Sequence, residues 1–190
     1  MGVTANFSFP YPELTDAPDG PSQIEALAGA VDTKLEAVVT GLPFPPLPAY
    51  KASDTSRSTT TTLTGDPDLQ VGVDANGRYF FWLFLDYEGG TQGASDLKLE
   101  WSGPSGTTIA WTPIYIGNAG AQNVGSLGGT TATVVAGTNG SGNKRALVAV
   151  GTVFVSSTGG MLELTWAQNS SSGTATVLHG QSAMVLLRMA

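Results

Sequence analysis

The first regular pattern of apolar positions along the chain lies between two clusters of proline. Most residues there are good helix formers, and the apolar positions recur at spacings of four, three, four and three. This heptad spacing predicts a helix with one narrow apolar seam. Ser22 and Glu25 have the spacing of a capping box and Gly41 ends the helix, which we place at residues 21–40. The seam consists of Ile24, Ala28, Val31, Leu35 and Val38.

A seam this short, from Ile24 to Val38, is marginal in water by itself, since about 12–15 residues is the lower limit even for strong helix formers. Something must therefore pack on the seam. Two partners fit the pattern: the larger domain of the same chain, or identical helices of other copies in a short parallel bundle. We favour the bundle, and the pattern alone leaves both interpretations open.

Proline-rich segments flank the predicted helix. Proline at alternate or adjacent positions in 41–49 predicts an extended, polyproline-like spacer. Residues 1–20 form an irregular arm, which either remains free or docks into a partner. We expect docking, because the arm carries four large apolar side chains. These are Phe7, Phe9, Tyr11 and Leu14.

From residue 50 onward, short apolar runs are separated by Gly, Asn, Asp and Pro. About ten short strands with turns at this spacing predict an all-β head over 50–190, a sandwich or jelly roll. We expect the chain as a whole to be mainly β, with one helix. The predicted strands are 59–63, 69–73, 78–87, 96–102, 107–112, 131–135, 145–155, 161–168, 174–178 and 183–189.

Most of these strands alternate, as a strand with one buried face does. In 161–168, for example, Leu162, Leu164 and Trp166 share the face that we expect in the core. The run 78–87 is different because both of its faces are apolar. One face carries Tyr79, Phe81, Leu83 and Leu85, and the other carries Phe80, Trp82 and Phe84.

Only one face of a strand points into the core of a two-layer sandwich, so the second face of 78–87 needs another cover. That cover is either the segment 114–143 of the same chain or another subunit. We favour a subunit interface built on Phe80, Trp82 and Phe84, because burying a large aromatic side chain contributes roughly 1.5–3 kcal/mol.

Composition narrows the function classes. With 41% apolar and 12% charged residues, the chain is too hydrophobic to be disordered. Residues 1–100 carry fourteen acidic and five basic residues, a net charge of −9, and 101–190 carry a net charge of +2. Three scattered basic residues make no phosphate-binding stripe, so we expect no nucleic-acid partner. No cysteine is present, so the chain has no disulfide and no thiolate metal site. No apolar run approaches the ~18 residues that cross a bilayer, so we expect no membrane insertion.

The residues that could carry chemistry are few. His179 is the single histidine, and we expect it at the surface beside a turn. Asp66 with Asp68, and Asp86 with Glu88, could pair as catalytic carboxylates or calcium ligands, but they fit turns and strand ends better. No nucleophile elbow, P-loop or dinucleotide motif occurs. We therefore predict a protein without catalytic residues, metal or cofactor.

Two stretches resemble the minor tail and fibre proteins of tailed bacteriophages, particularly those that infect actinobacteria. They are YPELTDAPDGPSQIEALAGAVDTKLEA at 11–37, with its proline-bearing arm and small-residue helix, and MLELTWAQNSSSGTATVLHGQSAMVLLRM at 161–189. The less specific SRSTTTTLTGDPDLQVGVDANGRYFFWLFLDY at 56–87 extends the resemblance over most of the chain outside 104–143.

The resemblance implies a homotrimer with a jelly-roll head, similar in architecture to the tumour-necrosis-factor family. It also implies that the arm at 1–20 binds other virion proteins, that the helix at 21–40 is trimeric, and that the chain is made in the cytoplasm of an infected bacterium. The expected role is a minor tail or tail-fibre protein that attaches to the host surface. A capsid-bound head fibre or decoration protein would use the same parts.

The least similar region, 114–143, is where a host-binding head is expected to vary. Polar and aromatic side chains there could bind a cell-surface glycan by hydrogen bonds and stacking, or could be ordinary loop residues. The candidates are Tyr115, Asn118, Gln122 and Asn123.

Overall fold

The chain divides into two compact units, Met1–Pro45 and Pro46–Ala190. The computed structural model describes residues 2–3, 10–11, 20–40, 46–91, 93–117 and 119–189, except for the side chains of 2–3, 10 and 37–40.

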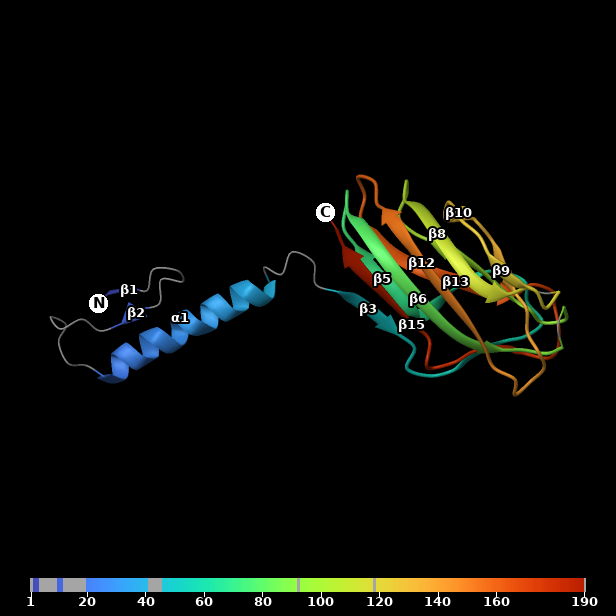
Figure 1. The fold of residues 1–190 in the computed structure, drawn as a ribbon, viewed down its shortest axis with the longest axis horizontal. Coiled ribbons are helices and arrows are strands. Elements are labelled where there is room, and N and C mark those ends of the chain that lie inside the picture. The colour runs from blue at the N-terminus through green and yellow to red at the C-terminus, as the bar shows by residue number, and fades with distance from the viewer. Residues whose placement is uncertain are drawn as a thin grey trace. The chain divides into compact units, whose positions relative to one another are not determined.

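The described residues of the N-terminal unit form one helix, α1 (Gly20–Thr40), and a short antiparallel pair, β1 (Gly2–Val3) with β2 (Pro10–Tyr11) (Figure 1). The helix agrees with the predicted 21–40, but its beginning corrects the predicted cap. Ser22 lies inside the first turn because the helix already begins at Gly20. Pro21 favours this earlier start, since the first turn of a helix leaves its N–H groups without intrahelical partners and proline lacks that group.

The second unit is a β-sandwich of two antiparallel sheets, which confirms the predicted mainly-β head (Figure 1). The large sheet has nine strands and the small sheet has four. The large sheet consists of β3 (Leu47–Tyr50), β4 (Thr55–Arg57), β6 (Arg78–Glu88), β8 (Thr108–Ile116), β9 (Gln122–Val124), β10 (Leu127–Gly128), β12 (Arg145–Phe154), β14 (Thr176–Leu178) and β15 (Ala183–Arg188). The small sheet consists of β5 (Thr64–Val73), β7 (Leu97–Ser102), β11 (Val134–Ala136) and β13 (Gly160–Gln168).

Strand β6 is central to the large sheet. It pairs with β12 along one side, and with β15 and then β14 along the other. Beyond these neighbours, β8 and β9 extend the sheet next to β12, and β3 pairs with β15. In the small sheet, β13 lies between β5 and β7, and β11 pairs with β7.

The core lies between the facing sides of the two sheets. As the alternation predicts, the buried face of β6 contributes Tyr79, Phe81, Leu83 and Leu85. Leu162, Leu164 and Trp166 of β13 are fully buried opposite them. Phe81, Trp101 and Trp111 form an edge-to-face aromatic series at the centre of this core. The alternation of apolar and polar residues along each strand is therefore enough to identify which faces of the two sheets pack together.

Several strands differ from the sequence analysis. β4, β9 and β10 are not among the predicted strands, and β5 begins at Thr64 rather than at residue 69. Residues 47–49, predicted as part of the spacer, belong to β3, so the second unit begins at Pro46 rather than at residue 50. Pro48 is tolerated because β3 lies at an edge of the sheet, where a missing N–H costs no ladder hydrogen bond on the open side. The predicted strand 59–63 is irregular, and Thr59 adopts a left-handed backbone conformation with φ 56°.

Candidate functional site

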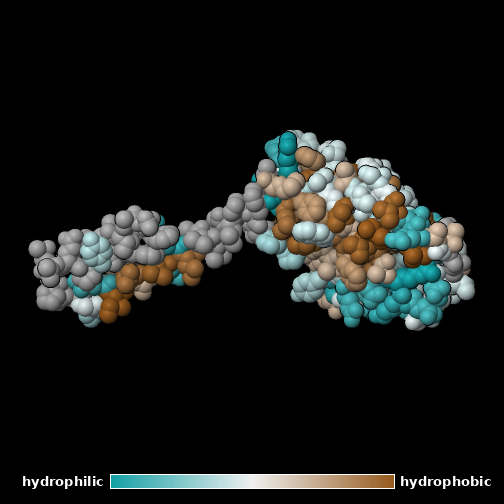
Figure 2. Space-filling view, viewed as in Figure 1, coloured by the Kyte–Doolittle hydropathy of each residue, from teal (hydrophilic) through white to brown (hydrophobic). Residues whose placement is uncertain are grey.

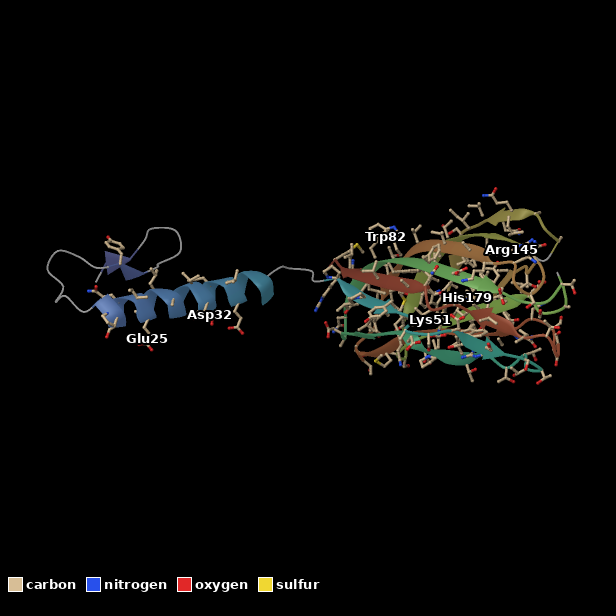
Figure 3. All side chains as sticks on the ribbon, turned by 90° about the horizontal axis from the view of Figure 1, so that it is seen from below. Glu25, Asp32, Lys51, Trp82, Arg145 and His179 are labelled. Atoms are coloured by element: carbon tan, nitrogen blue, oxygen red, sulfur yellow. The ribbon has the colours of Figure 1, made fainter. Side chains whose placement is uncertain are left out.

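The most distinctive surface of the head is the outer face of the large sheet. Trp82 and Phe84 of β6 are 46% and 42% exposed there, and Phe80 is half-buried. Trp82 points away from the sheet (Figure 3). The second apolar face of 78–87 is thus turned outward in a single chain, as the sequence analysis requires for an interface.

The register of the sheet extends this apolar face across six strands. The residue pairs Tyr50–Ala183, Ala183–Phe84, Phe84–Val148, Val148–Ile114 and Ile114–Val124 are direct neighbours on successive strands. No member of this row is charged, and all except Ala183 are exposed. Figure 2 shows apolar residues gathered over this part of the head. We call this surface the outer apolar face and define it by the row and by Phe80, Trp82 and Val185.

A hollow of about 410 Å³ opens within the outer apolar face. It lies where β3, β15, β6 and β12 run side by side. Soluble monomers rarely expose contiguous apolar surface of this kind, and where they do it usually marks an interaction site. The residues that line the hollow include Tyr50, Trp82, Phe84, Val148, Met184 and Val185.

The segment 114–143 does not cover this face. Ile114, Tyr115 and Ile116 pair with Val124, Asn123 and Gln122, so the segment continues the sheet sideways as β8 and β9. It then reaches the small sheet through β11, which pairs with β7. The alternative that 114–143 folds over the aromatic face is therefore wrong, because its strand-forming residues are used to extend both sheets.

The helix presents a second apolar surface. Ile24 and Leu35 are 70% and 59% exposed, and Val31 is also exposed. Figure 2 shows an apolar stripe along α1. A shallow groove of about 420 Å³ follows the seam and includes Leu27, a member that the four-three spacing did not include. The side chain of Val38, the last predicted member, lies outside the described residues.

The other predicted contact residues are described in part. Tyr11 of the arm is exposed, whereas Phe7, Phe9 and Leu14 lie outside the described residues. In the predicted host-contact loop, Gln122 and Asn123 are exposed on β9 and Asn118 lies outside the described residues. Tyr115 packs partly against the core, and burial raises the pKa of its hydroxyl. Tyr115 therefore offers less surface for stacking than the sequence suggests.

His179 is buried, which corrects the expectation of a surface residue. Its Nδ1 lies 3.0 Å from Asp54 Oδ2, and its Nε2 lies 3.7 Å from Glu88 Oε2. Asp54 also accepts a hydrogen bond of 2.8 Å from the backbone N–H of Gly180. The N–H of Gly180 first, and the His179 ring second, hold the pKa of Asp54 below its usual value. The cluster fastens the turn after β14 to the segment between β3 and β4.

A second buried cluster was missed by the sequence analysis. Lys51, labelled in Figure 3, and Asp66 are fully buried. Lys51 Nζ lies 2.9 Å from Asp66 Oδ2. The sequence predicts Asp66 in a turn, but the structure places it within β5, where its Oδ1 accepts the backbone N–H groups of Asp68 and Leu69. The local hydrogen bonds of Asp66 can be expected from the Asp-Pro-Asp sequence. Its pairing with Lys51 cannot, because only the fold brings Lys51 to Asp66.

The carboxylates of Asp86 and Glu88, which the sequence analysis considered as a possible pair, have other partners. Asp86 instead pairs with Lys144 Nζ at 3.1 Å, and Glu88 accepts the backbone N–H of Gly142. Over the described ranges, no group of three or more Asp, Glu and His side chains is arranged to hold a metal ion. The part of the chain that the structure describes also contains no helix long and apolar enough to cross a membrane.

Comparison with known proteins gives weak likeness only. No protein-family model matches the chain, and no curated protein matches it. Two matching solved structures are the infectious bursal disease virus Gt strain, with a TM-score of 0.21 and 9% identity, and the infectious bursal disease virus VP2 subviral particle, with 0.22 and 8%. The matches cover 76% of this chain but 42% and 40% of those chains, so it spans about two-fifths of their length. At such TM-scores the likeness identifies neither fold nor function.

Proposed function

We propose that this chain is a non-enzymatic structural protein of a phage virion, a homotrimeric appendage with a jelly-roll head. The outer apolar face is the observation that carries the proposal. A row of apolar side chains across six strands is exposed in one chain, and water contact with such a surface is unfavourable by about 25 cal/mol per Å². Contact with further copies removes that cost.

The exposed seam of α1 supports the same assembly. Heptad spacing suits a parallel bundle of identical helices, in which each seam residue inserts between residues of its neighbours. The heads of several copies would then associate with one another, and so would their helices. Because head and helix are linked in one chain, association of the heads raises the effective concentration of the helices for each other, and the reverse. This explains how a seam of only about four turns can hold a bundle together.

The virion location and the number three rest on the resemblance of 11–37 and 161–189 to phage minor tail and fibre proteins. In this role, the arm at 1–20 binds other virion proteins and the head faces the host surface, where Gln122 and Asn123 are available for polar contacts with glycan. The protein is made in the cytoplasm of the infected bacterium. Neither a cofactor nor a metal has a part in this function.

Sedimentation equilibrium of the purified chain tests the assembly. We expect about three times the protomer mass of 19.5 kDa. A monomer whose mass is independent of concentration would refute it, and a stable dimer would refute the three-fold arrangement.

Labelling of intact virions tests the location. We expect an antibody against the head to bind at the tail, and deletion of residues 1–20 to leave a folded head that is absent from particles. Label over the capsid shell would replace the tail role with that of a head fibre or decoration protein. Release of saccharide from host envelope by the purified protein would overturn the non-enzymatic role.

A further inference from the structure

We propose that Lys51 and Asp66 become joined by an intramolecular isopeptide bond. The two side chains come from different parts of the sandwich, since Lys51 directly follows β3 of the large sheet and Asp66 belongs to β5 of the small sheet. Lys51 Nζ lies 3.0 Å from Asp66 Oδ1 and 2.9 Å from Oδ2. Because both oxygens are bonded to Cγ, the amine is also close to the carbon that it must attack.

The burial of this pair favours condensation over a permanent ion pair. Both side chains have no exposed surface. Withdrawing an ammonium and a carboxylate from water costs several kcal/mol per ion, and their attraction often fails to recover that cost. Condensation removes both charges and replaces them with a neutral amide, which suits an enclosed site better.

The bulge in β5 holds the carboxylate as a reacting acyl group. β13 pairs Glu163 with Gln70 and Thr165 with Gly65, so residues 66–69 bulge out of the ladder. Within the bulge, Oδ1 accepts the backbone N–H groups of Asp68 at 3.1 Å and Leu69 at 3.2 Å. Two fixed N–H donors on one oxygen stabilise the negative charge that develops there when the amine adds to Cγ. Oδ1 is thus the oxygen that remains as the amide carbonyl.

Oδ2 is the oxygen that leaves. It accepts a hydrogen bond of 3.0 Å from Trp166 Nε1, which helps to stabilise it as the Cγ–Oδ2 bond breaks. Asp68 supplies a base, since its Oδ2 lies 3.4 Å from Lys51 Nζ and its side chain is 29% exposed and therefore in contact with water. A carboxylate at this distance can take a proton from the ammonium. The leaving Oδ2 itself lies 2.9 Å from Nζ, so it can receive protons that the nitrogen loses.

The reaction balances without a co-reactant. The Nζ–Cγ bond forms and the Cγ–Oδ2 bond breaks. Two of the three ammonium protons leave with Oδ2 as water, and the third stays on the amide nitrogen. The positive and negative charges disappear together, and nothing is oxidised or reduced. Fixed groups in contact react at effective molarities of roughly 10⁵–10⁸ M, which allows a weak acyl group such as a carboxyl to react without activation.

The position of the bond gives it a mechanical use, and this use rests on the proposed function. β3 is the first strand of the head and pairs with β15 through four residues, Leu47 to Tyr50. A force that arrives through the N-terminal segment would therefore peel β3 from an edge. A covalent bond at Lys51 would stop the peeling at that residue and transfer the load to β5.

Mass spectrometry of the purified, denatured full chain tests the bond. We expect a mass lower than that of the sequence by one water. Trypsin should fail to cleave after Lys51, and peptide 35–57 should remain joined to peptide 58–78, which contains Asp66. This readout uses the denatured chain, so it is independent of trimer formation and of any place in a virion.

Two variants separate the bond from other causes. Lys51→Arg retains the positive charge but should show the full mass, and Asp68→Asn should retain the fold while most of the chain stays uncondensed. The sequence Asp19–Gly20 could also lose water by cyclising, but that loss would persist in Lys51→Arg and map to another peptide. Full mass in the unsubstituted chain, with normal cleavage after Lys51, would overturn the proposal and leave a buried ion pair.

Discussion

The rings of Phe80 and Trp82 pack edge to face on the outside of the large sheet, with centroids 4.6 Å apart and planes at 87°. Edge-to-face packing orders both rings before any partner arrives, which lowers the entropy lost on association. The pair is therefore suited to form the centre of a subunit interface, where large aromatic residues carry most of the binding energy.

Trp82→Glu is expected to dissociate the proposed trimer, because it places a charge at the centre of the proposed interface, which would have to lose its water on association. Sedimentation should show the protomer mass, and the β-sheet signal in circular dichroism should be unchanged. Met161→Glu is the matched control, since Met161 is 49% exposed on β13 of the other sheet and should leave the assembly intact. A trimer that survives Trp82→Glu would place the interface elsewhere.

Val31→Asp is expected to reduce the helical signal in circular dichroism and to weaken assembly. Val31 belongs to the exposed seam, and an aspartate there would be desolvated in a bundle. Thr33→Asp is the control because Thr33 is exposed and does not belong to the seam. If both variants lose helicity equally, helix propensity rather than bundling accounts for the loss.

The core faces and the helix follow from local pattern, and this is why they could be predicted. Leu162, Leu164 and Trp166 alternate with outward residues, and the heptad of α1 needs no knowledge of the rest of the chain. By contrast, β3 was missed because proline argues against a strand unless the strand lies at an edge. That exception depends on β15, which lies at the other end of the chain.

The buried cluster around Lys51 shows even more clearly that local pattern cannot predict contacts between distant parts of the chain. Asp66 and Asp68 have the spacing of a turn, but both lie in β5, where Asp66 Oδ1 accepts the backbone N–H groups of Asp68 and Leu69. Trp166, which donates to Asp66, lies a hundred residues further along, and no local pattern links the two. His179 was likewise placed at the surface because its neighbours in sequence indicate a turn, whereas Asp54 and Glu88 enclose it in the fold.

Gly151→Ala is expected to destabilise the head by about 1–3 kcal/mol, the usual cost of overpacking a core. A Cβ at Gly151 would clash first with the backbone carbonyl oxygen of Ala110 and would lie 2.6 Å from Phe81 Cε1 and 2.7 Å from Trp111 Cβ, so the neighbouring strand and the central aromatic residues would have to move. Gly72→Ala is the control, since a Cβ there meets no atom within 4 Å. Denaturant unfolding at one protomer concentration should separate the two variants, and equal midpoints would mean that the core adapts without strain.

The stabilisation that Asp54 provides is expected to disappear in acid. Hydrogen bonds from Gly180 and His179 hold the pKa of Asp54 below its ordinary 3.8, so folding favours the ionised carboxylate. A lowered folded-state pKa gives stability that is complete above the unfolded-state pKa and is lost as the pH falls through the folded-state value. Asp54→Asn should therefore be less stable than the unsubstituted chain at about pH 6, and the difference should shrink below about pH 3.

Denaturant unfolding of both chains across that range measures the difference directly. Assembly contributes to the apparent stability of an oligomer, so both chains are compared at the same protomer concentration. The comparison can also be repeated in the Trp82→Glu background, where dissociation removes the concentration dependence. A difference that stays constant from about pH 6 to about pH 2.5 would show that Asp54 acts through its shape rather than its charge, because loss of the charge by protonation would then change nothing.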